Sequence, residues 1–104
     1  MGADVTASYG RASELCLTKR LTVAGNIKAT AGKLYWVLIS NANSSMRNCV
    51  LHDDNDATSD VICTFYNPAN STRLYSFDPP IPCDTGIRFG SIESSDITIL
   101  GGYV

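Results

Sequence analysis

The nine residues KLYWVLISN, at positions 33–41, form the longest strand-like segment of this chain of 104 residues. Aromatic and β-branched residues fill much of it, and such residues favour a pleated, extended backbone. Strict alternation places the apolar residues on two faces, with Leu34, Trp36 and Leu38 on one and Tyr35, Val37 and Ile39 on the other. A strand that is apolar on both faces is typical of the centre of a sheet. We therefore expect it to lie centrally in a sheet, or beneath a second layer or a partner.

Shorter segments of the same kind flank this strand, and turn residues separate them. They lie at residues 14–18, 21–29, 47–52, 60–66, 72–77, 87–92 and 96–100. Within the second of these, Gly25 and Asn26 indicate a bulge or bend. The segment DPPIP, at residues 78–82, cannot form an interior strand, because its three prolines lack an N–H.

Seven or eight short strands at this spacing predict a single-domain antiparallel β-sandwich of the jelly-roll type. The domain is expected to span residues 14–104, preceded by an irregular N-terminal arm at residues 1–13. Composition agrees with an all-β fold. The chain has 23 Val, Ile and Thr residues but only two Glu and no Gln, which are good helix formers.

The low charge of the chain argues against several classes of partner. Lys and Arg number 8 and Asp and Glu number 10, for a net charge of −2. A nucleic-acid-binding domain usually carries a basic patch, and none is apparent here. No apolar run reaches the length of a membrane span, and residues 1–6 lack the features of a secretory signal. We therefore expect synthesis in the cytoplasm, with neither nucleic acid nor membrane as partner.

The four cysteines are Cys16, Cys49, Cys63 and Cys83. No two of them form a CxxC pair, which argues against zinc-ribbon and thioredoxin-like sites. In a reducing compartment we expect free thiols that pack as small hydrophobic side chains. One disulfide, between Cys49 and Cys63 on adjacent strands, stays open as an alternative.

Catalytic chemistry has few candidate residues in this sequence. His52 is the single histidine, and it stands beside Asp53 without a GxSxG elbow or another nucleophile motif. No phosphate-binding loop is present either. The sequence predicts a protein that is not an enzyme and that holds no cofactor or metal.

An acidic loop offers the one alternative ligand site. Asp53, Asp54 and Asp56 lie close together, and carboxylates are the ligands that Ca²⁺ prefers, although the loop lacks the glycine and distal glutamate of an EF-hand. Tyr66 and Tyr75 flank a nearby turn and would supply stacking surfaces. These residues define the alternative function, a glycan- or host-surface-binding module of the head- or tail-fibre type in which calcium takes part.

Three sequence patterns after residue 32 carry a family resemblance. They are the strand GKLYWVLISN, the turn and strand NPANSTRLYSF, and the proline-rich crossover PPIPCDTGI. The chain from residue 33 onward resembles small virion proteins of tailed bacteriophages, namely capsid decoration (cement) or head-fibre proteins with jelly-roll-like sandwiches. The resemblance implies an architecture and a structural role, and it brings no catalytic residues.

This resemblance implies a decoration protein on the exterior of the capsid, which binds and stabilises the assembled lattice of major capsid protein. The expected partners are that protein, copies of this chain, or both, in a homo-oligomer or a lattice-bound state. In the N-terminal arm, Val5, Tyr9 and Arg11 are the predicted contacts, because Tyr and Arg are enriched at interface hot spots.

Overall fold

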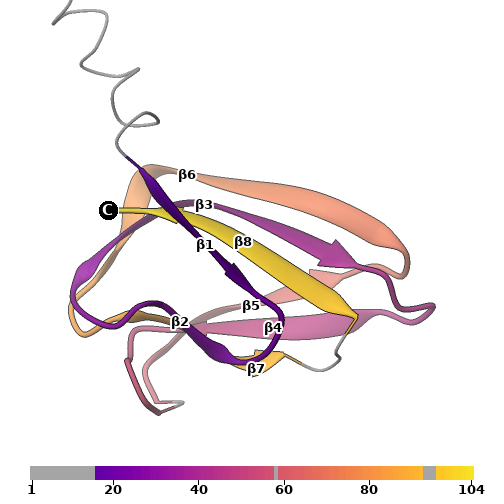
Figure 1. Cartoon of the computed structure of the whole chain (residues 1–104), viewed down its shortest axis with the longest axis horizontal. Coiled ribbons are helices and arrows are strands. Elements are labelled where there is room, and N and C mark those ends of the chain that lie inside the picture. The colour runs from indigo at the N-terminus through magenta and orange to yellow at the C-terminus, as the bar shows by residue number, and fades with distance from the viewer. Residues whose placement is uncertain (1–15, 58, 93–95) are drawn as a thin grey trace, which may run out of the picture.

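The computed structural model describes residues 16–57, 59–92 and 96–104. Eight strands fill most of this part of the chain: β1 (Leu17–Leu21), β2 (Gly25–Lys28), β3 (Gly32–Asn41), β4 (Arg47–His52), β5 (Val61–Asn67), β6 (Ser71–Cys83), β7 (Ile87–Ile92) and β8 (Ile97–Tyr103). They form two four-stranded sheets, which lie one above the other in Figure 1. Sheet A has the order β1-β8-β3-β6, and sheet B has the order β2-β7-β4-β5. The described residues contain no helix able to span a lipid bilayer.

The pairing shows how one chain produces these two sheets. β4 pairs with β5, β3 with β6, β2 with β7 and β1 with β8, all antiparallel, as in one long hairpin that turns back between β4 and β5. Wrapping that hairpin around itself adds the pairs β3–β8 and β4–β7. This is the arrangement of a jelly roll, so the predicted fold class is confirmed.

A continuous apolar core fills the space between the sheets. Sheet A contributes Leu34, Val37, Ile39 and Ile99, and sheet B contributes residues such as Leu51, Ile87 and Phe89, all fully buried. Phe65 packs against Tyr75, Phe77 and Phe89, with ring centroids 4.8, 6.4 and 6.1 Å away. Burial of this apolar surface is the main source of stability.

Two buried asparagines close one end of the core. Asn41, the last residue of β3, donates from Nδ2 to the carbonyl oxygens of Ser45, Asn67 and Pro68 at 3.0–3.1 Å. Asn67, the last residue of β5, donates to the carbonyl oxygens of Arg47 and Phe65. Because Asn41 belongs to sheet A and Asn67 to sheet B, the bond between them joins the two sheets where their strands end.

The central strand departs from the strict alternation that its sequence suggested. The β3 pairings shift register between Leu34 and Trp36, and this irregularity places Leu34 on the same inner face as Val37 and Ile39. Trp36 and Leu38 face outward and are half-buried. The predicted central place of this strand is confirmed, since β3 lies between β8 and β6 with its inner face against sheet B, but the predicted grouping of Leu34 with Trp36 and Leu38 was wrong. A bulge adds a residue and changes which side chains face the core.

The strands at the edges also differ from their predicted bounds. β1 begins at Leu17, and residues 22–24 separate it from β2, so the segment 21–29 is not one strand. A register irregularity does occur in β2, between Asn26 and Lys28. β6 continues through the prolines to Cys83 as an edge strand, where missing N–H groups are tolerated. The exclusion of this segment from the sheet interior was correct.

Candidate functional site

The loop at residues 53–60 is organised by the carboxylate of Asp54. One oxygen accepts backbone N–H bonds from Asn55, Asp56 and Ala57 at 2.7–3.3 Å, and the other accepts the Ser59 hydroxyl at 2.5 Å. The Ser59 bond, followed by the backbone bonds, lowers the pKa of Asp54 from 3.8 to about 2. This carboxylate holds its own loop in place.

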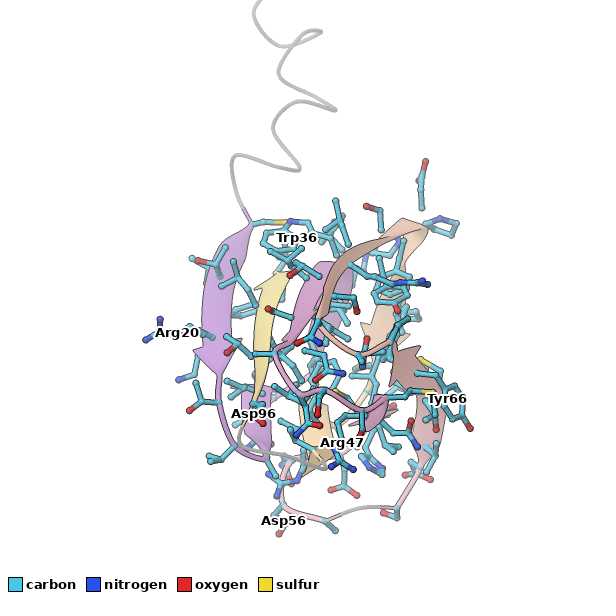
Figure 2. The ribbon with its side chains drawn as sticks, turned by 90° about the vertical axis from the view of Figure 1, so that its right-hand side faces the viewer. Arg20, Trp36, Arg47, Asp56, Tyr66 and Asp96 are labelled. Atoms are coloured by element: carbon cyan, nitrogen blue, oxygen red, sulfur yellow. The ribbon has the colours of Figure 1, made fainter. Side chains whose placement is uncertain are left out.

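The carboxylate of Asp53 joins that loop to the turn between β6 and β7. It accepts backbone N–H bonds from Asp84, Thr85 and Gly86 at 3.0, 2.8 and 3.3 Å. The bonds from Asp84 and Thr85 lower the pKa of Asp53 below its ordinary value. Asp56, by contrast, is exposed at the tip of the loop (Figure 2). In the described residues, no group of three or more His, Cys, Asp and Glu side chains is placed to hold a metal ion.

The structure does not bring the two tyrosines together with the acidic loop. The loop meets β5 at Val61, whereas Tyr66 lies opposite Asn48 at the other end of the β4–β5 pair. Five residue-to-residue steps of extended strand separate Val61 from Tyr66, a distance of about 17 Å. Tyr66 is exposed on sheet B, but Tyr75 belongs to sheet A and packs against Phe65. The predicted ligand surface is therefore split into separate places.

His52 and the cysteines occupy structural positions. His52 is buried at the end of β4, with Nδ1 3.1 Å from the carbonyl oxygen of Ser59. Cys49 pairs in register with Phe65, and Cys63 pairs with Leu51, so the expected alternative bridge is not formed. Cys16, Cys63 and Cys83 are free thiols. Burial, together with the nearby carboxylates of Asp53 and Asp84, raises the pKa of Cys83 to about 11.

The predicted contacts in the N-terminal arm, Val5, Tyr9 and Arg11, lie outside the described residues. A different surface, which the sequence analysis did not identify, is the outer face of sheet A. There the register places Arg20, Leu100, Leu38 and Leu74 side by side across all four strands. Leu74 is 62 % exposed, and Leu38 and Leu100 are half-buried. Together with Trp36 in the next row, these five residues form what we call the docking face.

Trp36 lies over a glycine on the neighbouring strand. Gly102 is its register partner on β8, and a Cβ atom at Gly102 would overlap the indole ring. The missing side chain therefore lets the half-buried indole lie close against the sheet. A flat aromatic ring held in this way is a rigid apolar contact surface, with little conformational entropy left to lose on binding.

Polar but uncharged side chains border the docking face. Beyond the leucine row, Thr98, Ser40 and Thr72 form a parallel row across three strands, with Thr72 Oγ1 3.2 Å from Ser40 Oγ. The charged member of the docking face is Arg20, on the edge strand β1, where it projects from the side of the molecule in Figure 2. An apolar centre with a polar rim is the usual anatomy of a protein-binding surface.

Comparisons of the chain with protein families, curated proteins and solved structures found no match. The strand order by itself does not select a function, because jelly rolls occur in capsid proteins, lectins and cupins alike. The docking face, with its row of exposed and half-buried apolar side chains, is therefore the candidate functional surface.

Proposed function

We propose that this protein is a structural component of a virion, a decoration protein that binds the assembled major-capsid lattice through the docking face. The observation that carries the proposal is the cross-strand row of Leu74, Leu38 and Leu100 beside Trp36 on the outer face of sheet A. The choice of a capsid lattice as partner rests on the sequence resemblance described above.

The chemistry of the docking face favours a protein partner over a sugar. Its four apolar side chains come from three adjacent strands, and Leu74 leaves most of its side chain in water. Burying such a row removes apolar surface from water, which drives association between proteins. Sugar sites need several polar groups that converge on hydroxyls, and the Asp53 and Asp54 carboxylates are already bonded within the fold.

The surface of the partner should be complementary to the docking face in shape and charge. It should present apolar side chains opposite Trp36 and Leu38, and a carboxylate opposite Arg20 at the margin. A patch that forms where neighbouring capsid subunits meet would exist only in the assembled lattice. Binding to the assembled form in preference to free subunits would stabilise the lattice by mass action. The contacts proposed for Val5, Tyr9 and Arg11 would add to this surface.

Co-sedimentation with capsids that have been stripped of the protein tests this proposal. The wild-type chain should pellet with the particles and saturate at a fixed number of copies per capsid subunit. Leu74→Lys should bind much more weakly, because it places a charge in the apolar row. Met46→Lys is the matched control, since it adds the same charge to an exposed apolar position in the turn between β3 and β4.

Failure of the wild-type chain to pellet with the particles would contradict the proposed function. Equal loss of binding in both lysine variants would show that net charge, and not the docking face, controls binding. That result would also reject the proposed surface.

A further inference from the structure

The docking face carries opposite charges at its two lateral margins. Arg20 lies at one margin, on the edge strand β1, where it pairs in register with Leu100. Asp78 is exposed at the other margin, on the edge strand β6. Because its neighbour Phe77 packs against Phe65 in the core, alternation along the strand turns Asp78 outward. One cation and one carboxylate therefore flank the same apolar surface on opposite sides.

Trp36 lies between these two charges. Its register partner on β6 is Ser76, which comes two residues before Asp78. Arg20 belongs to the adjacent leucine row, at the opposite edge of the sheet. A twofold axis that passes beside Trp36, parallel to the sheet, would lay the docking faces of two copies against each other. Arg20 of each copy then meets Asp78 of the other, and the apolar side chains come together between the two charge pairs.

From this arrangement we infer that a second copy of the chain covers the docking face in the free protein, as a dimer with the two copies of sheet A face to face. The docking face meets its own requirement for a partner, since it offers apolar side chains to Trp36 and Leu38 and a carboxylate to Arg20. The dimer is isologous, so each of these contacts occurs twice. The inference rests on the proposed function, because it states what shields the same surface until the lattice takes the place of the second copy.

The small size of the docking face predicts a weak dimer. Its five residues, together with Asp78, are fewer than the roughly 20–30 residues per partner of a standard interface. Interfaces that bury less than about 1,200 Å² in total are typical of transient complexes. Such a dimer dissociates on dilution, so monomers with a free docking face are available to bind the lattice.

Light scattering after size exclusion tests the inference by measuring the mass of the full chain. At concentrations well above micromolar, the wild-type chain should give twice the chain mass of 11.2 kDa. Arg20→Asp and Asp78→Arg should each give the monomer mass, because each variant places like charges opposite each other across the interface. Leu74→Lys should also be monomeric, since it places a charge in the apolar row.

A mixture of Arg20→Asp and Asp78→Arg gives the sharpest test. The first variant has a carboxylate at both margins and the second has a cation at both, so every facing pair of margins is again opposite in charge. The equimolar mixture should therefore recover the dimer mass, although each variant alone is monomeric.

Lys19→Asp is the matched control for the charge reversals. It makes the same change of charge at the neighbouring residue of β1, whose register partner Gly101 faces Ile27 in the core and not the docking face. Lys19→Asp should remain a dimer, and circular dichroism and melting curves should show that every variant is folded.

Three results would overturn the inference. They are a wild-type chain that stays monomeric at every concentration, a dimer that survives Leu74→Lys, and a mixture of the two charge variants that stays monomeric. Co-sedimentation with stripped capsids separates this inference from the proposed function. A monomeric wild-type chain that pellets with the particles would contradict the dimer alone, whereas a dimer that does not pellet would contradict the proposed function alone.

Discussion

The two lateral sides of the sandwich differ in the length, charge and packing of their edge strands. On one side β1 and β2 are short, and they carry Lys19, Arg20 and Lys28. On the other side β5 and β6 are longer, with no charged residue in β5 and only Arg73 and Asp78 in β6, and the rings of Phe65, Tyr75 and Phe77 pack between them. Figure 2 shows the contrast directly, with Arg20 on the first side and Tyr66 on the second.

The difference in charge affects how each lateral side can meet another molecule. Cations at a strand edge discourage pairing with further strands, so the first side is suited to remain in water or to meet a carboxylate of a partner. On the second side, aromatic rings fill the space between the two sheets, and the edge strand β5 contains neither a charged residue nor a proline.

The largest expected effect comes from removing the aromatic packing on the β5–β6 side. Phe65→Ala should lower the free energy of unfolding by about 4 kcal/mol, because it removes a large buried ring and leaves a cavity. Leu21→Ala, at an equally buried site on the β1–β2 side, should cost about 2 kcal/mol. Urea titration of both variants measures these costs. Equal costs would contradict the larger contribution expected from the aromatic packing on the β5–β6 side.

A smaller change in stability is expected when glycines are replaced by alanine, and its size should differ between Gly102 beside the docking face and Gly25 on the β1–β2 side. Gly102→Ala should displace the Trp36 indole and cost about 2 kcal/mol through overpacking. Trp36 is the only tryptophan, so its fluorescence reports the movement directly. Gly25→Ala in β2 would make only ordinary contacts with Leu21, and should change stability by less than about 0.5 kcal/mol. Unchanged emission in Gly102→Ala would contradict the close contact between the indole and the sheet.

The smallest expected effect is a pH-dependent loss of stability in the loop at residues 53–60. The pKa of Asp54 is lower in the folded state, so its ionised form stabilises the fold above pH 4 or so, and that contribution is lost as the pH falls toward 2. The loop should therefore lose protection from hydrogen exchange in this window before either lateral side does. Asp54→Asn should remove most of this pH dependence. A loop that keeps full protection at pH 2 would contradict the role of Asp54.

Sequence patterns were sufficient for the fold class because hydrophobic alternation and turn residues are local signals. The strands around Val37, Leu51 and Ile99 follow directly from them. The bulge near Tyr35 could not be predicted in the same way, because it depends on which residues of β6 lie opposite. β6 also shows that prolines do not end a strand that has one free edge.

The docking face was missed because it depends on pairing register. Leu38, Leu74 and Leu100 lie far apart in sequence, and only the β3–β6 and β3–β8 registers make them neighbours. The one local signal for an outward-facing apolar side chain was Leu74, which stands as an isolated leucine in the segment TRLYS. The acidic loop is a different case, because an aspartate followed by backbone N–H groups also forms a local turn, and Asp54 bonds to its own loop in this way.

The melting temperature of stripped capsids, measured with and without added protein, tests the central claim most directly. The proposed function predicts that the wild-type chain and Met46→Lys raise this temperature, because they bind the assembled lattice in preference to free subunits. Leu74→Lys should raise it much less at the same concentration. A wild-type chain that leaves the melting temperature of the particles unchanged at saturating concentration would contradict the account.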